Sequence, residues 1–253
     1  MLRRFAFVLV LVALATPSWA QFVAPGGTIP VVANLPGKNN TFWRSDVSIL
    51  NVSGENTTVQ MVLYPEIRNG QPTFETQTSD PIPVPAGQQV VLTNVVQSKF
   101  GLLDKKGALM IFSTDGKPVV LASRTYTTSD IGSYGQDVSS VVLTERAWIA
   151  GVENDSLYRT NVGIFWPWDS SAQFTLTVYD SQGEEAASGS FTFSRSGLIQ
   201  RGLDTLGVPD NLLSGWIEIT CSDATALWYA YGTTVDQSTG DSVFRPAQGH
   251  QPK

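Results

Sequence analysis

The sequence has almost none of the residues on which metal centres and nucleophilic catalysis most often depend. Its 253 residues include one cysteine, Cys221, and one histidine, His250. A Ser-His-Asp triad needs a histidine beside its serine, and transition-metal sites use clusters of histidine and cysteine. A single cysteine also excludes a disulfide within the chain. We therefore expect no cofactor, no thiol chemistry at Cys221, and a fold that depends on its apolar core.

Charged residues are also scarce, at 15%, and their balance is acidic, with a net charge of −6 at pH 7. An acidic chain is a poor partner for nucleic acid or for an anionic membrane surface. No apolar run reaches the roughly 20 residues that a membrane-spanning helix needs. The expected partner is a protein or glycan at the cell surface or outside the cell, without nucleic acid and without membrane insertion.

The first residues have the pattern of a secretory signal peptide. Arg3 and Arg4 form a basic start, the apolar run Phe5–Ala15 follows, and Ser18–Ala20 has the small-x-small pattern of a cleavage site. We expect residues 1–20 to be removed on export. The mature chain is then expected to be extracellular or periplasmic.

Two stretches of the sequence, Thr41–Leu50 and Ser156–Phe165, share one pattern. Both read aromatic-Arg-small-Asp/Asn-Val-small-Ile. The correspondence continues without a gap at Val59, Met61, Leu63 and Tyr64, which match Phe174, Leu176, Val178 and Tyr179. The separation of the two copies along the sequence is the length of a whole domain and exceeds the length of a solenoid repeat. We expect a first domain at residues 21–143, a second at 144–248, and a tail at 249–253.

Each copy contains about seven short segments that alternate apolar and polar residues, separated by turn residues. In the first copy Trp43, Val47 and Ile49 alternate with polar neighbours, and Asp115-Gly116 lies between two apolar runs as in a hairpin turn. Almost nothing reads as a long amphipathic helix. The expected class is all-β, with two tandem, internally duplicated antiparallel β-sandwich domains of the immunoglobulin-like kind.

Three segments of the second copy carry a resemblance to a known kind of domain. They are Leu157–Ile164, the turn Val178–Gly183, and Tyr229–Pro246 with its Val-Asp-x-x-Thr-Gly-Asp pattern. Together they resemble an uncharacterised domain found, often in tandem, in exported bacterial proteins and sometimes appended to secreted enzymes. The resemblance implies a β-sandwich-like accessory or surface module and supplies no catalytic residues. The first copy departs from the pattern at Ser129–Gly135.

Two polar pairs recur in the shared pattern, Arg44 with Asp46 and Arg159 with Asn161. Residues two apart in a strand lie on the same face. Recurrence in both copies favours a structural role, in which charge-assisted hydrogen bonds tie this strand to a neighbour or to the preceding loop. A ligand-binding role is the minority interpretation.

The segment Phe165–Asp169 contains the main candidates for ligand binding, Trp166 and Trp168. Its counterpart in the first copy, Leu50–Gly54, is an ordinary turn without tryptophan. Exposed aromatic side chains near a hairpin tip can stack on sugar rings or anchor a protein partner. The competing interpretation is that Trp166 caps the core and Trp168 covers the junction between domains.

Carboxylates give two weaker hypotheses. A glycosidase-like hydrolase needs two carboxyl groups roughly 5–9.5 Å apart, and the candidate pairs are Glu153 with Asp155 and Glu184 with Glu185. A calcium site at the loop Asp236–Asp241 is left open, although its two carboxylates also suit turn chemistry, in which they accept hydrogen bonds from nearby backbone amides.

The composition, the repeat and the resemblance together favour a non-enzymatic exported surface or accessory module that interacts with a protein or with matrix. The alternative is a carbohydrate-binding protein that uses exposed tryptophans. A hydrolase with a carboxylate pair comes third.

Overall fold

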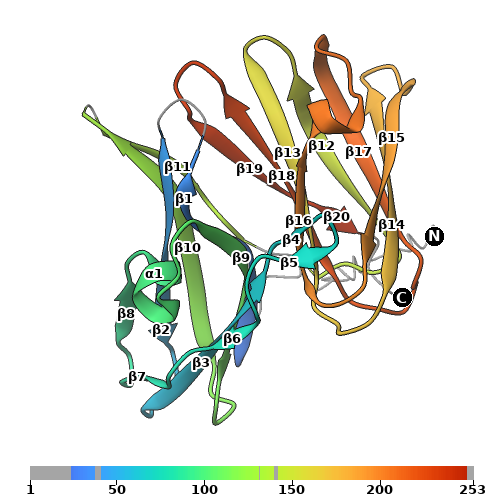
Figure 1. Ribbon diagram of the computed structural model, residues 1–253. Helices are drawn as coiled ribbons and strands as arrows, with labels where there is room; N and C mark the ends of the chain where they lie inside the picture. Colours follow the sequence, from blue (N-terminus) through green and yellow to red (C-terminus); the bar gives the residue numbers. More distant parts are fainter. Residues whose placement is uncertain (1–23, 38–40, 131, 140–141, 250–253) are drawn as a thin grey trace, which may run out of the picture.

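Antiparallel β-strands make up most of the chain (Figure 1). The structure is a computed structural model that describes residues 24–37, 41–130, 132–139 and 142–249. The expected signal peptide, residues 1–20, and His250 lie outside these residues. Within them, the longest helix is α1 (Val95–Phe100), and no helix is long and apolar enough to cross a membrane. The expected all-β class is confirmed.

The first half of the chain forms one continuous nine-stranded sheet. Its order is β11-β10-β2-β1-β9-β3-β6, with β7 also paired to β3 and β8 to β2. A separate short hairpin joins β4 and β5. The strands are β1 (Gly26–Pro36), β2 (Phe42–Asn51), β3 (Thr57–Pro65), β4 (Ile67–Arg68), β5 (Gln71–Pro72), β6 (Gln77–Thr78), β7 (Ile82–Val84), β8 (Gln89–Leu92), β9 (Lys105–Ser113), β10 (Val119–Ser129) and β11 (Gly132–Asp137).

The second half forms two separate sheets. The five-stranded sheet contains β15 (Glu185–Phe193), β14 (Ala172–Asp180), β17 (Leu212–Cys221), β12 (Arg146–Asn154) and β20 (Gln248–Gly249). The four-stranded sheet contains β16 (Gly197–Gly202), β13 (Tyr158–Trp166), β18 (Tyr229–Asp236) and β19 (Ser242–Pro246), and a 3-10 turn, η1 (Leu203–Leu206), follows β16. Because Gly249 pairs with Ala147, the segment expected as a tail begins inside a paired strand.

The same pairing pattern occurs in both halves. β2 pairs with β8 and β10, as β13 pairs with β16 and β18, and β9 lies between β1 and β3 as β17 lies between β12 and β14. The register of β1 against β9 shifts between Ile29 and Val32, and that of β12 against β17 shifts between Ala150 and Val152. The halves differ at β1, which also pairs with β2 and so joins two groups of strands that stay separate in the second half.

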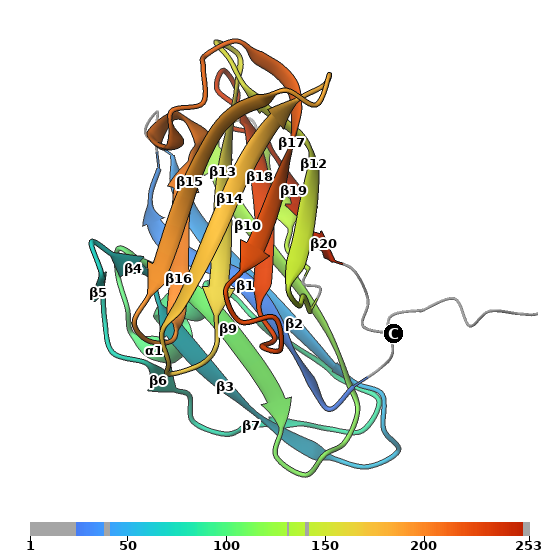
Figure 2. The same cartoon turned by 90° about the vertical axis from the view of Figure 1, so that its right-hand side faces the viewer.

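The four-stranded sheet lies between the rest of the second half and the first half (Figures 1 and 2). On one face, Ile164 and Trp166 of β13 join a second-half core that also contains Phe174, Phe193 and Trp228. On the other face, three side chains join the first-half core of residues such as Val47, Ile49 and Leu109; they are Phe165, Leu198 and Tyr231. Apolar burial on both faces therefore fixes the two halves against each other.

Gly163, between Val162 and Ile164, lies where β13 is buried on both faces. The ring of Tyr231 lies directly over Gly163, where a Cβ atom would meet the ring carbons and the phenol oxygen. Tyr231 is fully buried and stacks on Phe244 with ring centroids 5.4 Å apart. Burial raises its pKa well above the usual value for tyrosine. A glycine is required because only a bare backbone leaves room for this ring.

We expect Gly163→Ala to lower the free energy of unfolding by about 1–3 kcal/mol, because the added methyl group overpacks the site under Tyr231. Urea denaturation followed by tryptophan fluorescence measures the change. Gly54→Ala is the matched control, since nothing lies within 4 Å of a Cβ atom there. Equal stability of the two variants would contradict close packing of Tyr231 on β13.

Candidate functional site

A cleft of about 510 Å³ lies between the two halves of the chain. The first half supplies one wall from β1, β2, β9, β10 and β11, with Arg68 of β4, and the second half supplies the other from β13, β16, β18 and β19. Clefts of this size are typical of small-ligand sites. Because each half supplies one wall, the cleft exists only in the assembled chain.

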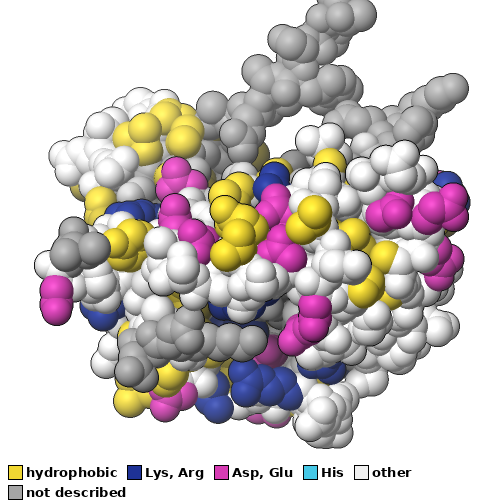
Figure 3. Space-filling model, turned by 90° about the horizontal axis from the view of Figure 1, so that it is seen from above, with side chains coloured by type: hydrophobic (Ala, Val, Ile, Leu, Met, Phe, Trp, Pro, Cys, Tyr) yellow, Lys and Arg dark blue, Asp and Glu magenta, His cyan; other side chains and the backbone are white. Residues whose placement is uncertain are grey.

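Four cationic side chains line this cleft: Arg68, Lys106, Arg159 and Arg201. No Asp or Glu is among its described lining residues, although the whole chain carries a net charge of −6. Figure 3 shows the molecule from above; several dark blue Lys and Arg side chains lie in the lower half of that view, with magenta Asp and Glu side chains among them. Positive charge in a cleft of an acidic protein favours an anionic ligand.

Two of the four cations, Arg68 and Lys106, share one carboxylate from within the fold. The carboxylate of Glu66 is almost fully buried and lies 2.6 Å from Nε of Arg68 and 3.0 Å from Nζ of Lys106. Nζ of Lys106 also donates a hydrogen bond to Oε1 of Gln200, at 2.6 Å, across the junction of the halves. Burial lowers the pKa of Lys106, and the charge of Glu66 acts in the opposite direction. Glu66 therefore favours the charged form of this mostly buried ammonium group.

The other two cations, Arg159 and Arg201, make no hydrogen bond or ion pair with any residue in the described part of the chain. Burial lowers the pKa of Arg159, and the charge of Asp204 opposes that effect. Charged side chains in partly buried positions are normally paired. The two guanidinium groups therefore have donors that the described chain leaves unpaired, and Arg159 also lines a smaller pocket with Asp155, Asp204 and Asp210.

The recurring polar pairs occupy different surroundings in the two halves. In the first half, the carboxylate of Asp46 accepts a hydrogen bond from the backbone N–H of Asn94 at 2.8 Å, which ties β2 to the start of α1. The guanidinium of Arg44 lies 5.8 Å from the ring centroid of Phe42 and 6.0 Å from that of Tyr126. In the second half, the corresponding pair, Arg159 and Asn161, lines the cleft.

The two tryptophans of the segment Phe165–Asp169 do not form one exposed surface. Trp166 is 1% exposed, packs edge-on against Phe174, and donates its indole N–H to the carbonyl of Ser170 at 2.8 Å. Trp168 is 46% exposed and donates its indole N–H to the carbonyl of Leu227 at 2.8 Å. Only the ring of Trp168 is placed to meet a ligand.

Of the carboxylates singled out in the sequence, Asp155 and Asp236 accept hydrogen bonds from nearby backbone amides, whereas Glu153 lies in β12 and Glu185 begins β15. Oδ1 of Asp236 accepts hydrogen bonds from the hydroxyl of Ser238 at 2.6 Å, and from the backbone N–H of Ser238 at 2.7 Å and of Thr239 at 3.1 Å. These bonds, that of the Ser238 hydroxyl first, lower the pKa of Asp236. Oδ1 of Asp155 accepts two backbone N–H groups, each at 2.7 Å. Within the described part of the chain, no three His, Cys, Asp or Glu residues lie close enough to hold a metal ion.

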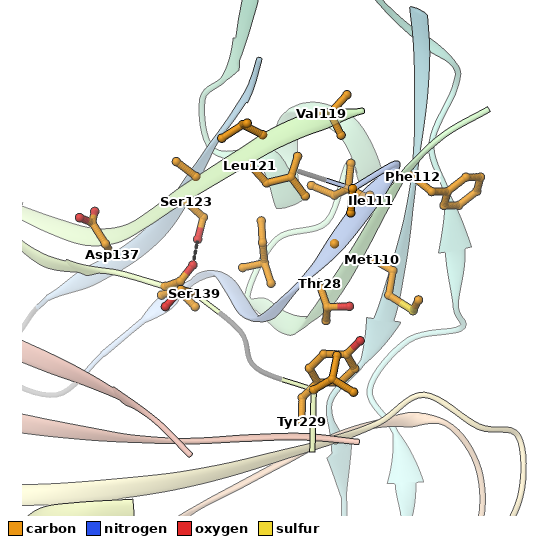
Figure 4. A pocket seen from close by; sticks show the side chains of 18 residues that line it. Thr28, Met110, Ile111, Phe112, Val119, Leu121, Ser123, Asp137, Ser139 and Tyr229 are labelled. Atoms are coloured by element: carbon orange, nitrogen blue, oxygen red, sulfur yellow. Dashed lines mark hydrogen bonds between the residues drawn. The ribbon is translucent and has the colours of Figure 1, made fainter. Parts of the chain in front are cut away.

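A larger groove, of about 720 Å³, lies beside β1 and β10 (Figure 4). Asp137 is the only carboxylate among its described lining residues, and the hydroxyl of Ser123 already donates to the carbonyl of Val138 at 2.8 Å. Specific sites combine apolar walls with several convergent polar groups. The groove has apolar walls with few such groups, so the cleft is the better candidate. The apolar lining of the groove includes Met110, Ile111, Phe112, Val119 and Leu121.

Most of the cleft was not found from the sequence. Arg159 and Asn161 were singled out, but Arg68, Lys106 and Arg201 were not. These three lie in separate strands and share no local motif, so only the packing of the two halves brings them together. Comparison with known proteins adds nothing to the site, because no protein-family model and no curated protein matches the chain.

We expect Glu66→Gln to lower the free energy of unfolding by about 3 kcal/mol, because the mostly buried ammonium group of Lys106 loses its ion pair and keeps the hydrogen bond to Gln200. Thermal or urea denaturation measures the loss. The control is Glu75→Gln, which removes an exposed carboxylate 3.2 Å from Arg195. This exposed pair is expected to contribute less than about 1 kcal/mol. Equal effects of the two substitutions would show that Glu66 does not neutralise a buried cation.

Proposed function

We propose that this protein is a non-enzymatic, exported binding module whose ligand occupies the cleft between its two halves. The observation that carries the proposal is the pair of cleft guanidinium groups, Arg159 and Arg201, for which the described chain provides no partner. The partner is a protein or a glycan at the cell surface or outside the cell. Nucleic acid is disfavoured by the net charge of −6.

The architectural part of the proposal is that the chain is an internally duplicated pair of immunoglobulin-like β-sandwich domains. The recurring strand-pairing order supports duplication, and so do the register shifts at Ile29–Val32 and Ala150–Val152. β-bulges are usually retained within families, so two at matching positions favour a common origin. The resemblance to tandem domains of exported bacterial proteins agrees with an accessory role.

The non-enzymatic part of the proposal is supported by the surroundings of the reactive side chains. The thiol of Cys221 is buried in the second-half core, and burial raises its pKa, which disfavours the nucleophilic thiolate. Lys117 is held at 3.0 Å by Glu55 and at 3.1 Å by Asp115. Both contacts favour the charged ammonium over a free amine that would act as a base.

A second candidate function is carbohydrate binding through Trp168. The observation in its favour is the half-exposed indole ring, whose N–H is fixed by the carbonyl of Leu227. A ring held in one orientation can stack on a sugar ring with little loss of side-chain entropy.

Blocking the cleft tests the main proposal. The chain from residue 21 onward is passed over solubilised cell envelope and over a panel of polysaccharides, and retained material is quantified. We expect Gln136→Trp, which places an indole ring at the lining of the cleft, to abolish saturable retention. Ser133→Trp is the matched control, because it adds the same ring to β11 at an exposed position outside the cleft. Undiminished retention of Gln136→Trp would overturn the proposal.

The second candidate makes a different prediction in the same assay. If Trp168 contacts sugar, Trp168→Ala should weaken retention on polysaccharide by about tenfold, as expected for loss of an aromatic anchor. Leu213→Ala serves as control, because Leu213 is another exposed apolar side chain. Retention that depends on the cleft but not on Trp168 would rule out this candidate.

A further inference from the structure

We propose that the cleft recognises an acidic saccharide, whose carboxylate is bound by Arg159 and Arg201. This inference rests on the proposed function of the cleft as the ligand site. It adds the chemical class of the ligand and the two residues that select it.

The cations of the cleft differ in whether a carboxylate of the protein pairs with them. Glu66 forms ion pairs with both Lys106 and Arg68, at 3.0 and 2.6 Å. Arg159 and Arg201 form no such ion pair in the described structure. Asp155, Asp204 and Asp210 line a smaller neighbouring pocket with Arg159, and Asp204 acts on Arg159 through its charge, but none of these carboxylates forms an ion pair with Arg159. An anion supplied by a ligand would complete the same pairing on this side.

A carboxylate fits these two side chains better than a diffuse negative charge does. Guanidinium groups present fixed, planar donors that match the two oxygens of a carboxylate and form short charge-assisted hydrogen bonds. Both groups are partly shielded from water in the cleft, and reduced exposure to water strengthens such pairs.

The remaining lining of the cleft favours a sugar as the carrier of the carboxylate. Oε1 of Gln136 is buried without a hydrogen-bond partner among the described residues, and its amide nitrogen lies 3.3 Å from Oγ1 of Thr233. Oγ of Ser242 is also buried without a partner there. Sugar hydroxyls both donate and accept hydrogen bonds, so they suit these amide and hydroxyl groups. The half-buried indole of Trp43 adds an apolar surface for the ring carbons of a sugar.

The location of the positive charge also limits the size of the ligand. The protein is acidic overall, and long polyanions would be repelled by the surface outside the cleft. The volume of about 510 Å³ therefore points to a short acidic segment, such as a few uronic acid units, with the remainder of the chain directed away from the protein.

Calorimetric titration of the chain from residue 21 onward tests this inference with three probes. Trigalacturonate carries the sugar and the charge, its methyl ester carries the sugar alone, and triglutamate carries carboxylates on a peptide. We expect saturable binding of trigalacturonate, with the ester and the peptide each at least about tenfold weaker. Raising the salt concentration should weaken binding of trigalacturonate more than binding of the ester.

Arginine variants assign the effect to the cleft. Arg159→Met and Arg201→Met keep a long apolar side chain and remove the charge, and each should weaken binding of trigalacturonate by at least about tenfold while leaving binding of the ester unchanged. Arg146→Met is the control, because Arg146 pairs with Glu218 at 3.2 Å and does not line the cleft. Unfolding midpoints of all three variants show whether the fold is retained.

The outcomes separate this inference from the proposed function beneath it. Equal binding of acid and ester, equal binding of peptide and sugar, or unchanged binding by both arginine variants would overturn the acidic-saccharide inference. The acidic-saccharide inference would also be overturned if trigalacturonate failed to bind while Gln136→Trp still abolished retention on the envelope. The cleft would then remain the ligand site for another partner. Failure of all three probes, together with unaffected retention of Gln136→Trp, would overturn both.

Discussion

Burial of the four-stranded sheet on both faces is the constraint on which the rest of the structure depends. Phe165 and Tyr231 complete the first-half core from one face, while Ile164 and Trp166 complete the second-half core from the other. Apolar surface buried from both sides holds the sheet in one position relative to the first half. A backbone bridge between Glu66 and Leu198 adds a polar contact at the same junction. The walls of the cleft are therefore set by packing.

The electrostatics of the cleft follow from where this packing ends. At the edge of the apolar contact, the ammonium group of Lys106 is held by Glu66 from the first half and by Gln200 from the second. Farther along the junction, Arg159 and Arg201 form no hydrogen bond or ion pair through their guanidinium groups in the described structure, although Asp204 acts on Arg159 through its charge. An acidic protein that keeps unpaired positive charge inside a cleft loses stability there, and functional sites are where such losses are commonly retained.

The sequence predicted local features of the fold well and the site poorly. Alternation in Val47 and Ile49 placed β2 correctly, because one face of that strand meets the core and the other is partly exposed. Alternation fails in β13, where Gly163 and Phe165 are as buried as their neighbours, because a second layer covers the other face. The cleft depends on that same layer, so its cations, drawn from distant strands, have no pattern in the sequence. The arginine of the repeated motif was recognisable, but its role in a cleft was not.

The contribution of Phe165, Leu198 and Tyr231 to the first-half core also affects how the chain reaches its native state. These residues follow the whole first half in the sequence, so the core of a newly made first half is incomplete until the second half has been synthesised and has packed against it. An incomplete core exposes apolar surface, and contacts between residues far apart in sequence form slowly. The first half is thus the segment most in need of protection from aggregation during biosynthesis, and the two halves are expected to gain their final order in a single late step.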